Sequence, residues 1–212
     1  MTKLAGLLLG TALAAFAIPA LATPPRNLTF DVLRKGESIG THAIAFREEG
    51  GRLEVEVTIK LEVKLLFVTV FRYDHVNHET WESGRLVRIV THTDDDGAAH
   101  AVRGEAGAGG FRVNAPPPGY VTAVDVMPTS WWNAQTVRRA ELLNSQKGEL
   151  LRVKILPGPE EAVATAAGDV PARRYLVTGD ADLELWYDRD GRLAKIRFKG
   201  GDGTPIEYRR RD

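Results

Sequence analysis

The stretch "LEVEVTIKLEV", residues 53 to 63, decides the fold class because its apolar and polar residues alternate without a break. Successive side chains of a β-strand point to opposite faces of the sheet. Such alternation is typical of an antiparallel strand with one buried face and one face in water. The predicted buried face carries Leu53, Val55, Val57, Ile59, Leu61 and Val63.

Shorter segments on either side repeat this pattern, and a recurring short sequence motif separates several of them. A glycine, a charged residue and a leucine end the stretches "GGRL" at 50–53, "SGRL" at 83–86, "KGEL" at 147–150 and "DGRL" at 190–193. Glycine supplies the positive φ that tight hairpins need. Roughly ten such strands in chain order predict a mainly β protein, a strongly curved antiparallel meander or an open β-barrel, because large sheets twist and curl.

One segment breaks the β pattern. The stretch "TSWWNAQTVRRAELL", residues 129 to 143, begins with Thr and Ser, which cap helices, and continues with Ala, Arg, Glu and Leu, which favour them. We therefore expect one short helix at about 129–143, placed over one mouth of the curled sheet.

The first 22 residues have the pattern of a signal peptide. Lys3 precedes an apolar run from Leu4 to Ile18, and Ala20-Leu21-Ala22 fits an A-x-A cleavage site. The run is short for a membrane span of about 20 residues. We expect cleavage after Ala22, a single β-rich domain over 23–212 without a transmembrane segment, and a periplasmic or secreted location.

Composition excludes several classes of function. Basic and acidic residues are equal at 28 each, so no net field favours nucleic acid, and we expect none as a partner. The chain has no cysteine, hence no thiolate metal ligand, cysteine nucleophile or disulfide. Phosphate-binding glycine loops and the G-x-S-x-G nucleophile motif are also missing. We predict no cofactor, no metal and, on balance, no enzyme.

The stretch "RYDHVNHETWESGRL", residues 72 to 86, contains the strongest candidate for polar chemistry. Its H-x-x-H-E spacing matches no zinc-protease motif, and on a strand residues three apart face opposite ways. Period two instead groups Tyr73, His75, Asn77, Glu79 and Trp81 on one face, the predicted concave side. His75 and Glu79 would then lie about 13–14 Å apart along a regular strand, too far for a direct hydrogen bond.

Three interpretations of this face stay open. It is a polar cluster that satisfies its own hydrogen bonds, or part of a ligand-binding surface, or the site of a hydrolase or metal-dependent enzyme that uses His75 and Glu79. A zinc site would need a third ligand such as His42, which neighbouring hairpins could bring close.

Apolar residues suggest where a ligand would bind. In "KLLFVTVF", residues 64 to 71, both faces are apolar, which predicts either a fully buried strand or a lip that contacts something apolar. Trp131 and Trp132 form a second apolar pair. We therefore expect a protein that binds an apolar or amphipathic small molecule, or an envelope partner. The predicted ligand-binding residues are Tyr73, His75, Glu79, Trp81, Leu65, Phe67, Trp131 and Trp132. A purely structural envelope protein, with a filled interior, is the remaining alternative.

The chain resembles a family of uncharacterised bacterial exported proteins of similar length. The resemblance is carried by "GESIGTH", "YDHVNHETWESGRL", "TDDDG", "SWWN", "LWYDRDGRL" and "GGDGTPIEY", which together span most of residues 23–212. More loosely, the chain is similar to open β-barrels of the periplasmic lipoprotein-carrier type, which cup an acyl chain. The resemblance implies an export signal and a curved β-fold, and it assigns no catalytic residue.

Overall fold

The computed structural model describes residues 25–115 and 118–212, and at Leu65 it describes the backbone alone. The expected signal peptide, residues 1–22, lies outside the described residues. No helix in the two described ranges is both long and apolar enough to cross a membrane.

The described chain forms one antiparallel sheet of fourteen strands. Its spatial order is β8-β7-β6-β5-β4-β3-β2-β1-β14-β13-β12-β11-β10-β9. Chain neighbours pair within each half, and β1 pairs with β14 where the halves meet. The meander prediction is confirmed, and the sheet is open, with β8 and β9 as its two edges. The strands are β1 (Leu28–Arg34), β2 (Glu37–Glu49), β3 (Arg52–Leu65), β4 (Val68–Glu82), β5 (Arg85–Asp95), β6 (Ala98–Gly107), β7 (Gly110–Val113), β8 (Tyr120–Thr122), β9 (Glu141–Leu143), β10 (Leu150–Thr165), β11 (Gly168–Gly179), β12 (Leu183–Asp188), β13 (Leu193–Lys199) and β14 (Pro205–Arg210).

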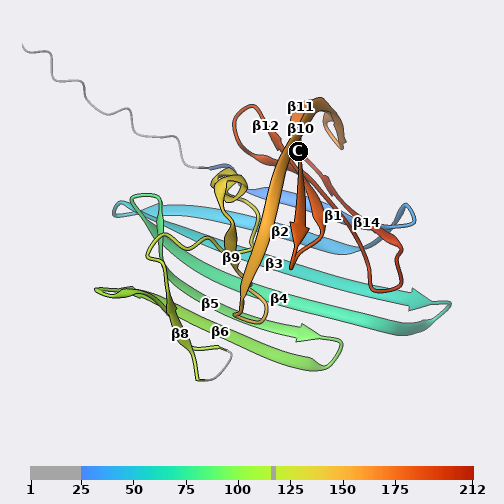
Figure 1. The fold of residues 1–212 in the computed structure, drawn as a ribbon. Coiled ribbons are helices and arrows are strands. Elements are labelled where there is room, and N and C mark those ends of the chain that lie inside the picture. Colours follow the sequence, from blue (N-terminus) through green and yellow to red (C-terminus); the bar gives the residue numbers. More distant parts are fainter. Residues whose placement is uncertain (1–24, 116–117) are drawn as a thin grey trace, which may run out of the picture.

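The sheet curls so that its two halves face each other. In Figure 1 the long strands β2 to β6 form a curved layer, and β10 to β12 rise steeply across it. The inner face encloses one hydrophobic core, in which Phe30, Ile44, Phe111, Leu185 and Leu193 are essentially inaccessible to water. Burial of each such side chain stabilises the fold by about 1.5–3 kcal/mol.

A glycine bends β2 where it passes the inner face. Gly40 has φ of 152°, and a Cβ there would lie 1.9 Å from the carbonyl oxygen of Lys60. The register with β1 shifts at the same place, between Val32 and Leu33. Only glycine permits this close approach of β2 to β3, which shapes the wall beside His42.

The predicted helix at 129–143 is wrong. The segment contains a single 3-10 turn, η1 (Ala134–Arg138), and then the strand β9. Trp131 has φ of 60°, which no α-helix allows, and Leu142 and Leu143 are both buried. Adjacent buried leucines suit a short strand covered on two sides, so tertiary burial overrides the helix propensity of the segment.

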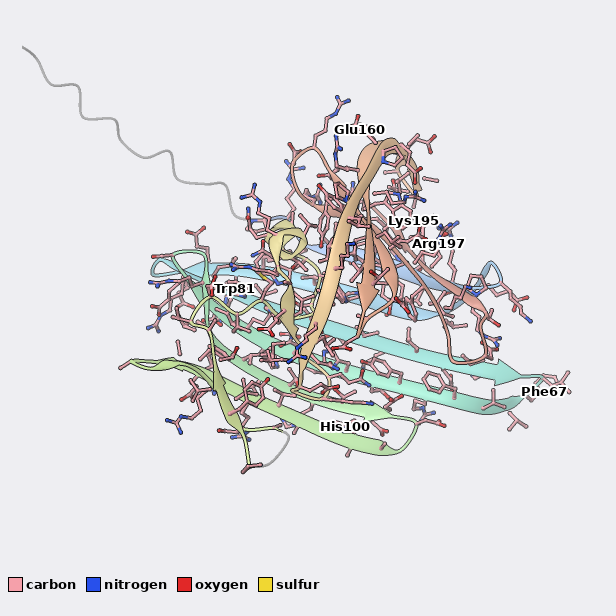
Figure 2. The ribbon with its side chains drawn as sticks, in the orientation of Figure 1. Phe67, Trp81, His100, Glu160, Lys195 and Arg197 are labelled. Atoms are coloured by element: carbon pink, nitrogen blue, oxygen red, sulfur yellow. The ribbon has the colours of Figure 1, made fainter. Side chains whose placement is uncertain are left out.

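The apolar segment 64–71 forms the far end of the β3–β4 hairpin and is exposed. Leu66 and Phe67 make the turn with 87% and 99% of their surface accessible, and Val68 and Val70 are also exposed. Figure 2 shows Phe67 beyond the main body of the molecule. The interpretation as a fully buried strand is therefore wrong, and the segment is an apolar lip.

Candidate functional site

A cavity of about 690 Å3 opens on the inner face of the curled sheet. Its walls come from β2 to β4 on one side and from β12 to β14 on the other, and the 129–146 segment covers part of it. Most of the lining is aliphatic or aromatic. The apolar lining residues include Ile39, Val57, Ile59, Leu61, Val63, Val70, Phe71, Trp131, Leu183, Ile196, Phe198 and Ile206.

His75 projects into this cavity from the middle of β4. It is 3% exposed, and its Nδ1 lies 2.8 Å from the Thr93 hydroxyl on β5. The Tyr73 ring stacks beside it at 6.2 Å between ring centroids. Burial lowers the pKa of His75 to about 4, so the imidazole is neutral near pH 7.

His42 lies in the same cross-strand row, two strands away. The row runs from Phe30 through His42, Ile59 and His75 to Thr93. Two strand spacings place the two histidines about 9.5 Å apart. His42 is 1% exposed and lines the cavity, and neither ring nitrogen has a hydrogen-bond partner among the described residues. Burial, and then the neighbouring His75, lower its pKa to about 3.

The sequence suggested His42 only as a possible zinc ligand and not as a residue of the ligand-binding surface, although a signal for its place on that surface was present. In β2 the buried positions alternate as His42 and Ile44, and Phe46 is partly buried on the same face. This period-two pattern puts His42 on the apolar side of a strand next to β3. The wall that carries Phe198 and Tyr208 gave no local signal, because the pairing of β14 with β1, far apart in the chain, brings it beside His42.

Glu79 belongs to a different, closed cluster at one end of β4. Its carboxylate accepts hydrogen bonds from Asn77 at 2.7 Å, from the Trp81 indole at 2.8 Å and from the Trp132 indole at 2.9 Å. Burial raises the pKa of Glu79, and these donors and Ser130 partly oppose that rise. The Trp132 ring also packs edge-on against Trp81 and Phe46. Glu79 therefore fastens the 129–133 segment to the sheet, and it does not line the cavity.

The eight predicted ligand-binding residues separate into groups. Tyr73, His75 and Trp131 line the cavity. Glu79, Trp81 and Trp132 form the closed cluster. Phe67 lies on the exposed lip, and the side chain of Leu65 is outside the description.

The arrangement does not bring His75 and Glu79 to one reacting centre. They lie two rows apart on β4, and Glu79 is enclosed by its own donors. Within residues 25–115 and 118–212, no three histidine or carboxylate groups are close enough to hold a metal ion, so His42, His75 and Glu79 form no such site.

Charged groups at the cavity are few and mostly acidic. Arg34 is ion-paired with Asp202. Asp95 accepts a hydrogen bond of 3.2 Å from the Gln146 side chain, and Asp182 is the remaining charged lining residue. The cavity is thus an apolar chamber with neutral polar groups on one wall and a slightly acidic rim.

Comparisons with known proteins agree with this fold and assign no activity. The chain matches a crystal structure described as a beta-barrel-like protein of domain of unknown function DUF1849 from Brucella abortus, with a TM-score of 0.60 and 13% identity over 87% of this chain and 94% of that one. At this identity the likeness shows the fold alone. The search of curated proteins found no match. The family model "Domain of unknown function (DUF6134)" matches residues 30–211, and the chain therefore belongs to the DUF6134 family.

Proposed function

We propose that this protein is an exported, non-enzymatic binding protein that takes an apolar or amphipathic small molecule into the cavity between the two halves of its sheet. The observation that carries the proposal is the cavity of about 690 Å3 with its aliphatic and aromatic walls. Small-molecule sites have volumes of about 300–1,000 Å3, apolar linings and a few polar groups that orient the ligand.

The alternative of a purely structural protein predicts a filled interior. The inner face is filled at one end, around Glu79 and Trp132, and hollow in the middle, around Ile59 and His75. A core that served stability alone would be close-packed throughout, with few voids larger than a water molecule. The hollow region therefore supports binding.

Export is supported by the N-terminal sequence pattern, with Lys3, the apolar run to Ile18 and the Ala20-Leu21-Ala22 site. Cell fractionation tests it. When the full sequence is expressed, the mature protein is expected in the periplasmic or culture fraction with Thr23 as its first residue by N-terminal sequencing. A chain that stays in the cytoplasm with Met1 intact would refute export and leave the binding proposal untouched.

Binding is tested with the full chain purified from a bacterial host. N-phenyl-1-naphthylamine, which fluoresces in apolar surroundings, is titrated into the protein. The substitution Ile59→Trp fills the cavity from β3 and is expected to weaken probe binding by at least about tenfold, because the added indole overlaps the ligand volume. Leu156→Trp on β10, which is 44% exposed and does not line the cavity, is the matched control.

Two outcomes would contradict the proposal. In the first, the probe fails to bind the wild-type protein. In the second, Ile59→Trp binds the probe as tightly as the wild type and the control Leu156→Trp do. Circular dichroism on each variant establishes that the fold is retained. Solvent extraction of the purified protein, followed by mass spectrometry, then identifies any molecule that has co-purified with it.

A further inference from the structure

The lip, residues 64–71 at the end of the β3–β4 hairpin, gathers apolar side chains at one exposed place. Among the large apolar side chains that the structure describes, those of Phe67 and Leu66 are the most exposed, at 99% and 87% of their surface. Val68 and Val70 beside them are also more than half exposed. In Figure 2 Phe67 stands clear of the rest of the molecule. Single apolar side chains on a surface are ordinary, whereas a contiguous group of them marks a place of interaction.

The turn of this hairpin is built differently from its neighbours. The β1–β2, β4–β5 and β5–β6 turns place a polar residue at positive φ and a glycine after it, in the pairs Lys35-Gly36, Ser83-Gly84 and Asp96-Gly97. At the β3–β4 turn Leu66 has φ of 58° and Phe67 follows it. The left-handed conformation is costly for leucine and nearly free for glycine. Folding alone does not favour this pair, so strain held at an exposed turn indicates that the apolar side chains serve a contact.

The lip continues directly into the wall of the cavity. Val70 and Phe71 are neighbours in the chain, and both line the cavity, although neighbours on a regular strand point to opposite faces. The register explains this, because Val63 pairs with Phe71 and Lys64 pairs with Thr69, which leaves Val70 as the extra residue of a bulge. Bulges re-aim side chains in this way. Since Val70 is both exposed and part of the cavity wall, the lip lies at the mouth of the cavity.

The charges nearest the lip are positive. Counted from the turn, the first charged residue is Lys64 on β3 and Arg72 on β4. Glu62 lies farther back and contacts both cations, at 3.1 Å from Lys64 and 3.3 Å from Arg72. One carboxylate between two cations leaves a net positive charge behind the apolar tip. Apolar side chains with cations one layer behind them match a phospholipid surface, where acyl chains lie beneath phosphates.

The shape of the lip also favours a bilayer over a protein partner. A stable protein interface buries about 1,000 Å2 or more of matched surface. The protruding tip of one hairpin offers only a few side chains. A bilayer accepts a few apolar side chains from a narrow tip, because its acyl region needs no matching shape.

We propose that the lip inserts into the surface of a phospholipid bilayer and docks the mouth of the cavity against it. Leu66 and Phe67 enter the boundary of the acyl region, and Lys64 and Arg72 lie level with the phosphates. Anionic lipids strengthen the contact. The contact needs no ligand in the cavity, so it goes beyond the proposed binding function and is tested separately from it.

The apolar part of the contact is tested by co-sedimentation of the full chain with vesicles of phosphatidylcholine alone, and of equal parts phosphatidylcholine and phosphatidylglycerol. The wild type is expected to bind both, and the second more tightly. The double substitution Leu66→Ser and Phe67→Ser is expected to weaken binding at least about tenfold, because two apolar side chains no longer leave water. Leu156→Ser with Leu176→Ser, an exposed cross-strand pair on β10 and β11, is the matched control and should bind as the wild type does. All these proteins have the same N-terminus, so the apolar run at residues 4–18 contributes equally to each.

The charged part is tested on the vesicles that contain phosphatidylglycerol. Lys64→Gln with Arg72→Gln is expected to weaken binding by about fivefold for each cation removed. Arg52→Gln, at the other end of β3 and likewise ion-paired, with Glu82, is the control and should leave binding unchanged. High salt should weaken the wild type toward the level of the double glutamine variant.

Insertion is measured directly with a single label, since the chain has no cysteine of its own. A nitrobenzoxadiazole dye on Val68→Cys should brighten on addition of vesicles and be quenched by nitroxide groups on the lipid acyl chains. The same dye on Leu156→Cys should do neither.

Three results would overturn the proposal. The wild type fails to bind either kind of vesicle, or the double serine variant binds as tightly as the wild type, or the dye at position 68 stays unquenched. Sedimentation velocity adds a fourth. If the double serine substitution converts a dimer into a monomer, the lip is covered by a second copy of the chain. N-phenyl-1-naphthylamine binding is measured beside each result, and it leaves the proposed function standing when only vesicle binding fails.

Discussion

Strand β4 carries two polar groups on its inner face, one enclosed by hydrogen-bond donors and one beside an open cavity. At one end, Glu79 is surrounded by matched donors from Asn77, Trp81 and Trp132. Two rows away, His75 borders an open cavity, and across β3 from it His42 has no partner at all among the described residues. The strand period is the same in both places. The difference is the 129–133 segment, whose Trp132 closes one end and whose Trp131 only borders the other.

A buried polar group whose hydrogen bonds are all made within the protein has a structural role. A buried polar group without hydrogen-bond partners beside a cavity indicates a candidate site. Glu79 attracted attention in the sequence because it is an acid near two histidines. Its role is structural, because a buried carboxylate with three donors holds its neighbours rigidly and leaves no position for a substrate. Substitutions at Glu79, His42, Trp132 and Leu66 test this contrast.

Replacing Glu79 with alanine should have the largest effect. Glu79→Ala leaves the indole N–H groups of Trp81 and Trp132 and the Asn77 amide without acceptors, and unpaired buried donors are costly. We expect the free energy of unfolding to fall by about 3–5 kcal/mol in urea titrations. Glu105→Ala, at an exposed position on β6, is the control and should change it by less than about 0.5 kcal/mol. Similar values for the two variants would mean that the cluster does not fasten the segment.

His42→Phe should reduce the sensitivity of stability to acid. The folded-state pKa of His42 is lowered from 6.5 to about 3, so its contribution is present above pH 6.5 and is lost as the pH falls toward 3. The wild type should therefore lose about 1.4 kcal/mol per pH unit through His42 below pH 6.5, or about 3 kcal/mol by pH 4, that the variant keeps. Glu79 acts with the opposite sign in both proteins, since its raised pKa removes stability as the pH rises, and it cancels in the difference. Parallel urea-titration curves for the two proteins from pH 7 to 4 would contradict the burial of His42 as a neutral group.

Trp132→Phe separates the hydrogen bond from the packing of the same residue. Phenylalanine retains an aromatic ring against Phe46 and Trp81 and loses the indole N–H that donates to Glu79. We expect a loss of about 1–2 kcal/mol in the free energy of unfolding. In a double-mutant cycle with Glu79→Gln the two effects should be non-additive by at least about 0.5 kcal/mol. Strict additivity would show that the two side chains are not coupled.

Leu66→Gly concerns the other end of the same hairpin and should have the smallest effect. Leu66 has φ of 58° in the exposed turn, a conformation that costs a branched residue roughly 1–2 kcal/mol and glycine almost nothing. After the entropy cost of glycine in the unfolded chain, we expect stability to rise by at most about 1 kcal/mol. Leu156→Gly, exposed within β10, should instead destabilise. Figure 2 shows Trp81 and Phe67 at opposite ends of this hairpin, the packed end and the exposed lip.

The sequence by itself determined the strands, the turns and the face to which each side chain belongs. Strict alternation in residues 53 to 63 is a local property, and it carried over correctly to the buried face of Tyr73, His75, Glu79 and Trp81. The turns with glycine at 51, 84 and 191 are likewise local, because each requires a positive φ within a few residues.

Only the tertiary structure decided which part of that face is hollow. The pairing of β1 with β14 brings Phe198 and Tyr208 to the same cavity as Ile59. Pairing with β10 makes Leu142 and Leu143 part of a strand, where their propensities favour a helix. Both outcomes depend on contacts between residues far apart in the chain, whose burial energy exceeds local preferences of a few tenths of a kcal/mol per residue. For the same reason Glu79, which was expected to bind a ligand, is enclosed by its own donors, whereas His42, which was not, lines the cavity. Their place on a strand could be predicted, and the presence of a partner for each could not.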